Sequence, residues 1–420
     1  MSAANIGSEN VVKLDNGLKL IYSDIKTIPG RVNMTFVFNV GSSNDGDKPG
    51  ISHLAEHMAF GGTQTKDAKT LLGSLDNLTF GNHYAYTATD KTVFGIYTNT
   101  NSVSDAISLL VDMFSKSKVD DGYLEKEKKV IAHELNLRAD NPNVNLFNLF
   151  HKSFSYKNDD ATQKEFLKSL TSTDVKSFMA KNYTPENCTL IVTGDIDEDL
   201  LEWTVGRKTK LWKQSNKAED FVEKFTFKPG LFIEEGNTKS VYVGVVFDGP
   251  TTTDIKDFIS CSIFNCILGS GLNSKMMHKA RIEKGLTYDI RPIMMCEKNY
   301  GLWGIMTATD KESYKELVDT IAESIRSFKG LINSDNVAIA RMRIKASILD
   351  EPLKPGEKTS EIMFFEDFGV DKDELISLID RTTSDDVQKW LKSSFASGCS
   401  LAIYGDIDNQ DINGLDFQIN

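Results

Sequence analysis

Residues 171–197 read TSTDVKSFMAKNYTPENCTLIVTGDID, and residues 382–408 read TTSDDVQKWLKSSFASGCSLAIYGDID. The two stretches resemble each other, and Cys188 matches Cys399 at an offset of 399 − 188 = 211. Each stretch combines a helical pattern with an apolar run typical of a buried strand. A repeat of this length indicates that the chain contains two copies of one structural unit.

A second match lies nearer the start of each copy. The segment VNMTFVFNVGS begins at Val32 and VYVGVVFDGPT begins at Val241, an offset of 241 − 32 = 209. Each half opens with an alternating β-branched and aromatic segment, continues through amphipathic helical stretches and closes on a helix followed by a strand. This order predicts an α+β fold of two similar α/β sandwich domains.

Two helices and one boundary follow from the pattern. An apolar stripe predicts a helix over 103–116, and Leu124, Val130 and Ile131 predict another over 123–139.

The chain has 420 residues, whereas single cores stop growing at roughly 250 to 300 residues. Lys-rich polar residues and Pro229-Gly230 favour a boundary near residue 218. We therefore expect domains at 1–218 and 219–420.

Composition limits the possible functions. The net charge of −12 argues against a nucleic-acid partner, which would require a basic face. No apolar run reaches the roughly 18 residues of a membrane span, and the first residues lack the pattern of a signal peptide. The 5 cysteines include no CxxC pair, so neither a disulfide framework nor a thiolate zinc site is indicated. We expect a cytoplasmic protein without a membrane partner.

The segment His53-Leu54-Ala55-Glu56-His57 carries the clearest chemical signal. On a helix, positions i and i+4 share a face, so His53 and His57 can present ring nitrogens to one metal ion. Glu56 stands beside them and can reach water at such an ion. Pro49-Gly50 and Gly61-Gly62 bracket the segment as a short helix. The alternative is a pair of partly buried histidines next to a salt bridge.

The order HxxEH is the inverted form of the HExxH zinc helix, and in it the sequence resembles the pitrilysin family, which includes insulin-degrading enzymes and mitochondrial processing peptidases. In that family a glutamate on a later helix is the third zinc ligand, and another glutamate precedes it by two turns. Glu134 and Glu127 match these two, because 134 − 57 = 77 and 134 − 127 = 7. His133 and His83 are rival ligands, which we discount because His133 is rotated by about 100° from Glu134 and His83 lies in an expected strand.

The resemblance covers nearly the whole chain and implies further roles. Arg281 and Tyr288, in the segment from Gly269 to Ile290, match residues that contact the bound peptide and its reacting carbonyl. The run from Gly81 looks like an edge strand whose counterpart in relatives pairs with substrate. Ala85 and Thr87 match that strand, but Tyr84 stands where relatives have an asparagine. His151 and His278 have no motif around them.

The family resemblance finally implies an activity and an assembly. The chain looks like the half-sized branch of the family, so it would form half of a clamshell chamber, as a homodimer or as a heterodimer with a related subunit. It would act as a zinc metalloendopeptidase with one Zn²⁺ per chain, hydrolysing unfolded peptides. Glu56 would be the base, His53, His57 and Glu134 the ligands, and Glu127 a supporting group. Two alternatives remain, a non-catalytic structural subunit and a peptide-binding protein on the same fold.

Overall fold

The structure is a computed structural model that describes residues 4–6, 9–154, 158–215, 225–269, 275–350, 352 and 354–407. The chain separates into two compact units. The first comprises 1–135, 160–223 and 351–371, and the second comprises 136–159, 224–350 and 372–420. The boundary expected near residue 218 falls in 216–224, outside the described residues, and stays a prediction.

A seven-stranded sheet organises the first unit, in the order β1-β2-β3-β7-β4-β6-β5. Its strands are β1 (Ala4–Ile6), β2 (Glu9–Lys13), β3 (Lys19–Asp24), β4 (Arg31–Phe38), β5 (His83–Thr87), β6 (Thr92–Asn99) and β7 (Cys188–Gly194). Neighbouring strands are antiparallel, except that β3 runs parallel to β7. Among the described residues no strand pairs with the outer edge of β5, and this edge is important for the site described below.

The sheet of the second unit repeats this topology. Its order is β10-β11-β9-β12-β8, with β8 (Leu231–Glu235), β9 (Val241–Asp248), β10 (Ile290–Cys296), β11 (Gly301–Thr309) and β12 (Cys399–Gly405). Read from β8, it matches β3-β7-β4-β6-β5, and its one parallel pair, β8 with β12, matches β3 with β7. The predicted α+β fold of two similar domains is therefore confirmed.

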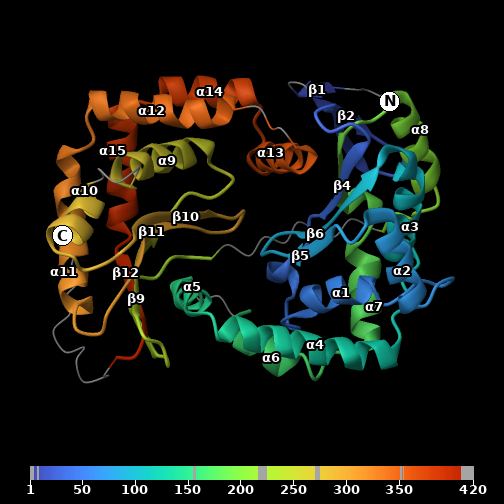
Figure 1. Cartoon of the computed structure of the whole chain (residues 1–420), viewed down its shortest axis with the longest axis horizontal. Helices are drawn as coiled ribbons and strands as arrows, with labels where there is room; N and C mark the ends of the chain where they lie inside the picture. The colour runs from blue at the N-terminus through green and yellow to red at the C-terminus, as the bar shows by residue number, and fades with distance from the viewer. Residues whose placement is uncertain are drawn as a thin grey trace. The chain divides into compact units, whose positions relative to one another are not determined.

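The helices of the first unit lie on both faces of its sheet, with α13 against one face and α1, α3 and α7 on the other (Figure 1). The first unit contains α1 (Ile51–Ala59), α2 (Ala68–Thr79), α3 (Val103–Ser115), α4 (Asp121–Ala139, most of its length), α6 (Asp160–Phe166), α7 (Ser172–Asn182), α8 (Glu198–Thr209) and α13 (Pro355–Phe368). Side chains alternate across β4, so Phe36 and Phe38 pack toward α3, whereas Val37 packs toward Ile362 of α13.

The second unit has the same arrangement of helices around its sheet. It contains α5 (Pro142–Lys152), α9 (Ile255–Gly269), α10 (Lys275–Met277), a π-helical turn (His278–Glu283), α11 (Tyr314–Ser327), α12 (Ser334–Leu349), α14 (Lys372–Arg381) and α15 (Ser384–Ala396). Helix α5 packs on β9 and β12, as α13 packs on β4 and β7. Each half of the sequence thus donates one helix to the other unit, at an offset of 355 − 142 = 213. The repeat alone did not predict this exchange.

Each half of the sequence ends on a helix followed by a strand, α7 and β7 in the first half and α15 and β12 in the second. Local hydrogen bonds explain why these two segments fold alike. In α7 the Asp174 carboxylate accepts from the Thr171 amide at 2.8 Å, and in α15 Asp386 accepts from Thr383 at 2.8 Å. Both copies therefore begin with a capping box. The second copy is one residue shorter between helix and strand, because 188 − 172 = 16 and 399 − 384 = 15.

The turn that follows β7 in the first unit and β12 in the second contains a glycine for a steric reason. Gly194 has φ +127° and Gly405 has φ +147°, which L side chains rarely adopt. A Cβ on Gly194 would lie 2.2 Å from the Arg31 carbonyl oxygen, and one on Gly405 would lie 2.8 Å from the Ser240 carbonyl oxygen. Both copies therefore require glycine at this position.

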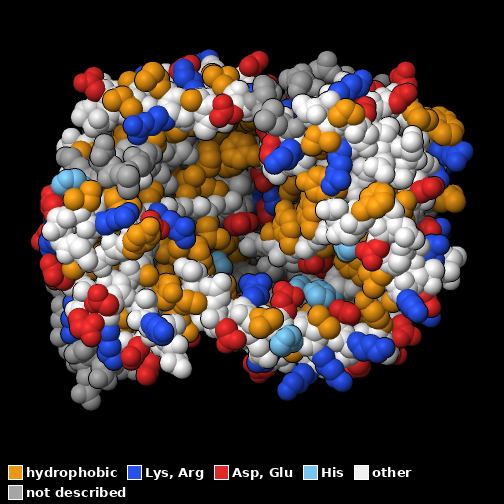
Figure 2. Space-filling model, in the orientation of Figure 1, with side chains coloured by type: hydrophobic (Ala, Val, Ile, Leu, Met, Phe, Trp, Pro, Cys, Tyr) orange, Lys and Arg blue, Asp and Glu red, His pale blue; other side chains and the backbone are white. Residues whose placement is uncertain are grey.

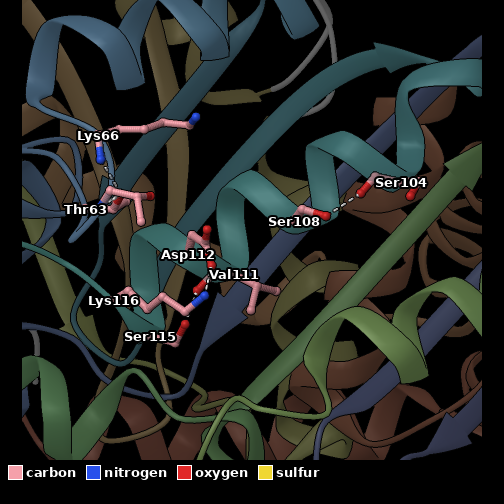
Figure 3. A network of polar contacts seen from close by, with 9 residues as sticks. Thr63, Lys66, Ser104, Ser108, Val111, Asp112, Ser115 and Lys116 are labelled. Atoms are coloured by element: carbon pink, nitrogen blue, oxygen red, sulfur yellow. Dashed lines mark hydrogen bonds and ion pairs between the residues drawn. The ribbon is translucent and has the colours of Figure 1, made fainter.

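Helix α3 confirms the expected helix over 103–116. Ser108 Oγ donates to the Ser104 carbonyl at 2.8 Å, and Ser115 Oγ donates to the Val111 carbonyl at 2.6 Å (Figure 3). The Lys116 ammonium lies 2.7 Å from the Asp112 carboxylate. These polar groups are satisfied on the outer face, so the opposite face can pack into the core.

Two other sequence interpretations need correction. In α4 the buried apolar residues are Leu124, Ile131 and Leu135, whereas Val130 is exposed, because the stripe follows the i, i+7 and i+11 positions. The run from Gly81 is a hairpin and not one edge strand, since β5 ends at Thr87 and β6 begins at Thr92. Of these two strands, only β5 lies at an edge of the sheet. Among the described residues, no helix is long and apolar enough to cross a membrane.

His151 of α5 is expected to make the stability of the second unit depend on pH. Burial lowers the pKa of His151 to about 4, and its Nε2 lies 3.1 Å from the Tyr300 hydroxyl. Since this pKa is below the ordinary 6.5, the neutral ring stabilises the fold above pH 6.5, and that contribution is lost as pH falls toward 4. The loss amounts to at most about 3 kcal/mol.

Denaturant unfolding at pH 7 and pH 4.5 measures this effect. We expect His151→Gln to lose less stability between these two values than the wild type. An identical loss in both proteins would contradict the role of His151.

Candidate metal centre

Helix α1 carries the histidine motif, and a local cap fixes where it begins. Gly50 precedes the helix with φ 84°. The Asp45 carboxylate accepts from the amides of Gly50 at 2.7 Å and Ser52 at 3.1 Å. A carboxylate at this end is favourable because the first helical amides have no partner within the helix. Buried Leu54, on the opposite side, fixes the helix against the core.

His53, His57 and Glu134 meet at one point. Glu134 Oε2 lies 3.7 Å from His53 Nε2 and 3.6 Å from His57 Nε2. One ligand atom from each of the three residues lies within 4.8 Å of the other two. Among the described residues, this is the one group of three or more potential metal ligands that lie so close together. Donors of a tetrahedral zinc at about 2.0 to 2.1 Å stand roughly 3.3 to 3.5 Å apart. The donor set and its spacing therefore fit zinc.

The cluster is open to solvent on one side. Figure 2 shows histidine side chains at the surface beside acidic side chains, over α1 and α4. The side chains of His53 and His57 are 14% and 18% exposed, and that of Glu134 is 42% exposed. Three protein donors with an accessible side are typical of catalytic zinc sites, whereas structural sites use four and are closed.

Glu127 holds one histidine in place. Its Oε2 lies 2.9 Å from His57 Nδ1, so that nitrogen donates to Glu127 and Nε2 faces Glu134. Burial, and then the nearby Glu127, raise the pKa of Tyr123, one turn earlier on α4. Tyr123 also packs against Gly61, where a Cβ would lie 2.8 Å from its ring. Glu127 thus has the position of a supporting group beside the three donors.

Glu56 is buried beside the cluster but is not one of its donors. Burial raises the pKa of Glu56, although the Thr87 hydroxyl, which donates to Glu56 Oε2 at 2.6 Å, opposes this shift. A carboxylate with a raised pKa is a better proton acceptor near neutral pH. Thr87 belongs to β5, so the edge strand and the carboxylate are directly linked.

The charges around His57 favour a cation. Burial alone would lower its pKa, but the carboxylates of Glu127 and Glu134 outweigh burial and raise the pKa of His57 to about 9. The nearby imidazole rings of His53 and His57 hold the pKa of Glu134 far below its usual range. The protein groups alone thus attract positive charge, which a divalent cation would supply by displacing a proton.

The other histidines lie away from this point. His133 points to solvent on α4, and His83 faces Phe60, with ring centroids 6.3 Å apart. His151 contacts Tyr300 in the second unit, and His278 lies 3.0 Å from Glu283. None of these four belongs to the cluster found among the described residues.

Arg281 and Tyr288 lie in the second unit. Arg281 belongs to the π-helical turn, and its guanidinium carbon stands 4.5 Å from the centroid of the Tyr288 ring. Tyr288 follows that turn and is 80% exposed. The two side chains therefore contact each other, and their role toward substrate stays a prediction. Residues 270–274 of this segment lie outside the described residues.

The second unit has different residues at the positions of the motif. Applying the offset of 209 to α1 pairs His53, Glu56 and His57 with Ser262, Asn265 and Cys266 of α9. Burial supports this alignment, because Leu54 and Ala55 match the equally buried Ile263 and Phe264. Ser, Asn and Cys do not reproduce a two-histidine site with a carboxylate, so within the described residues the three-donor cluster lies in the first unit.

Sequence reasoning missed several residues that shape the centre. Asp45 caps α1 from six residues before the helix, and Tyr123 packs beside Glu127. An acidic residue before a glycine that opens a helix is a recognisable signal for the first. No local pattern points to Tyr123, because its role depends on contact with Gly61 across the fold.

Comparison with known proteins supports the relation that the motif suggested. Residues 26–163 match the family described as "Insulinase (Peptidase family M16)", and residues 169–344 match the one described as "Peptidase M16 inactive domain". The chain therefore belongs to the peptidase M16, or pitrilysin, family. The second description agrees with the absence of the donor set from the described part of the second unit.

Relatives and solved structures span nearly the whole chain. An uncharacterized zinc protease of Rickettsia felis is 25% identical over 409 residues, covering 95% of this chain and 98% of its own. The beta subunit of the mitochondrial-processing peptidase of Saccharomyces cerevisiae is 24% identical over 422 residues, covering 92% and 89%. The crystal structure of a protease from Helicobacter pylori matches with a TM-score of 0.82 at 17% identity, covering 96% and 100%.

Proposed function

We propose that this chain is a zinc metallopeptidase that hydrolyses peptide bonds of unfolded peptides. The observation that carries the proposal is the convergence of three zinc-type donors, His53, His57 and Glu134, beside the buried carboxylate Glu56. The zinc-protease names of full-length relatives support it. A structural subunit or a peptide-binding protein would need neither a complete donor set nor a carboxylate held beside it with a raised pKa.

In this proposal His53, His57 and Glu134 hold one zinc ion per chain. Zinc, when bound, supplies a Lewis acid that polarises water and the scissile carbonyl. Glu56 accepts a proton from the attacking water and passes it to the leaving amine. Thr87 orients Glu56 by donating to Oε2, so the second carboxylate oxygen is available for the proton.

The substrate form follows from the free edge of β5. Edge strands present unpaired N–H and C=O groups, and an extended peptide can add to them as a further strand. Because Thr87 of β5 contacts Glu56, a peptide on this edge lies next to the carboxylate. Folded proteins cover or blunt most of their edge strands, so unfolded peptides are the proposed substrates.

Mass-spectrometric mapping of cuts in a peptide library tests the proposal. We expect internal cuts that disappear when a chelator removes metal and return when zinc is added. A cutting pattern that the chelator leaves unchanged would reject the metal mechanism. A wild-type protein that holds zinc and cuts no peptide would favour the structural or peptide-binding alternative.

Glu127→Gln tests the supporting contact to His57. The amide keeps the shape of the side chain but removes the negative charge that holds Nδ1–H. We expect zinc affinity to fall by about 10- to 100-fold, the usual cost of losing such a partner. Competition with a chromophoric chelator measures this affinity.

Glu125→Gln is the matched control for this variant. Glu125 lies on the same helix, but it is exposed and pairs with Lys128. Its replacement should leave zinc affinity unchanged. Equal zinc affinities of Glu127→Gln and the wild type would show that Glu127 does not support the metal site.

A further inference from the structure

We propose that Tyr84 and Tyr86 determine which peptides the edge strand accepts, by selecting apolar side chains at two positions separated by one residue. This inference rests on the proposed peptidase function and specifies which side chains of a substrate peptide the site would prefer. Both tyrosines belong to β5, at the end of the seven-stranded sheet. They are 36% and 43% exposed, so part of each ring is accessible to a ligand.

The hydrogen-bonding pattern of β5 fixes which backbone groups are free. The Tyr97 amide donates to the Asn82 carbonyl at 2.9 Å, and the Ala88 amide donates to the Lys91 carbonyl at 2.8 Å. Tyr84 pairs with Gly95 in the same antiparallel register. Even-numbered residues of β5 therefore bond to β6, and His83, Ala85 and Thr87 turn their N–H and C=O groups toward the free edge.

The two faces of β5 differ in chemistry. Ala85 packs against the core that contains α1, and Thr87 on the same face donates to Glu56. Tyr84 and Tyr86 project from the opposite face, since successive side chains alternate along a strand. Tyr97 of β6 lies on that opposite face too, where Arg31 stands 5.0 Å from its ring centroid. The three tyrosines are named the tyrosine surface below.

Tyr84 is held in one orientation. It lies across β6 over Gly95, where a Cβ would come within 2.0 Å of Tyr84 Cζ. Its hydroxyl is 3.1 Å from Thr35 Oγ1, and Thr35 donates in turn to Asn33 Oδ1 at 3.0 Å. Since the Thr35 proton is used, Tyr84 is the donor. The hydroxyl is thus satisfied within the sheet, and the ring remains as an apolar surface.

Asn33 extends this anchor to α13. The Thr359 hydroxyl donates to Asn33 Oδ1 at 2.7 Å, and Asn33 Nδ2 donates to the Ile96 carbonyl at 3.2 Å. Every polar atom of the Asn33 side chain is therefore engaged, in a residue that is fully buried. A buried and satisfied network of this kind holds the Tyr84 ring rigidly and lowers the entropy lost when a ligand packs on it.

A peptide that pairs with β5 would meet both faces alternately. In an antiparallel pairing, the residue opposite Ala85 shares hydrogen bonds with it and turns its side chain toward Glu56. The residues before and after stand opposite Tyr84 and Tyr86 in non-hydrogen-bonded pairs, where Cα atoms are only about 4.5 Å apart. Cross-strand pairs of aromatic with apolar side chains are favourable by an amount that corresponds to up to about fivefold in affinity.

Cut-site mapping with zinc-loaded protein and a peptide library tests this inference. For the wild type we expect enrichment of aliphatic and aromatic residues at two positions that flank one unselective position. Tyr84→Asn, which removes the ring, should reduce the enrichment at one of these positions by up to about fivefold. Tyr84→Phe is the matched control, because it keeps the ring and should keep the preference. Tyr86→Asn should reduce the enrichment at the other position, which provides an independent test if Tyr84→Asn fails to fold.

The outcomes separate this inference from the peptidase proposal. Metal-dependent cutting with the same preferences in Tyr84→Asn and Tyr86→Asn would overturn the role of the tyrosine surface alone. Preferences at adjacent positions would also overturn it, because adjacent side chains face opposite sides of a strand. A zinc-loaded wild type that cuts nothing would overturn both proposals.

Discussion

Replacement of Glu56 by glutamine is expected to lower the rate of peptide cleavage by about 10²- to 10⁴-fold, the usual contribution of a general base, and to leave the zinc content unchanged. Glutamine has nearly the same shape and still accepts a hydrogen bond from Thr87. Glutamine cannot accept a proton at neutral pH, so no side chain at this position would take the proton from the attacking water. Steady-state cleavage of a fluorogenic peptide, together with metal analysis of the same sample, measures both quantities.

Glu202→Gln is the control for this variant. Glu202 accepts a hydrogen bond from the Tyr22 hydroxyl in the same unit but does not belong to the metal cluster. Its replacement should leave cleavage unchanged. Loss of zinc from Glu56→Gln would mean that Glu56 is a metal ligand, and retention of the wild-type rate would mean that another group is the base.

Glu134→Gln is expected to remove most of the zinc. Glu134 is the single charged donor of the proposed set, and its Oε2 lies 3.6 Å and 3.7 Å from the two histidine nitrogens. A neutral amide is a much weaker ligand for zinc than a carboxylate. Since a lost supporting contact alone costs about 10- to 100-fold in affinity, we expect a loss of more than about 100-fold here.

His133→Gln provides the control for Glu134→Gln, because His133 is adjacent in sequence but points to solvent. Zinc content per chain after dialysis, measured by mass spectrometry of the metal, should be near one for His133→Gln and near zero for Glu134→Gln. Full zinc content in Glu134→Gln would assign the third ligand to another residue.

Much of this architecture was readable from the sequence because its causes are local. The repeat near Cys188 and Cys399 reflects capping boxes and obligatory glycines that operate within a few residues. The spacing of His53 and His57 reflects one helical turn, and Glu127 and Glu134 lie two turns apart on α4. Family resemblance connected the two helices, since no local pattern links residues 77 positions apart.

The features that escaped prediction depend on contacts across the fold. The exchange of α5 and α13 between units leaves no trace in a repeat, because both helices still occupy matching positions in the sequence. The position of Tyr84 depends on a glycine in the next strand and on Thr35 in the one beyond. The homodimer, the cytoplasmic location and the substrate contacts of Arg281 and Tyr288 stay predictions.

Stepwise addition of zinc to metal-free protein tests the central claim most directly, with the rate of peptide cleavage measured at each step. The three-donor centre of His53, His57 and Glu134 predicts that the rate rises in proportion to zinc and reaches its maximum at one ion per chain. A metal-free protein that already cleaves at the full rate, or a zinc-loaded protein that never does, would contradict the account.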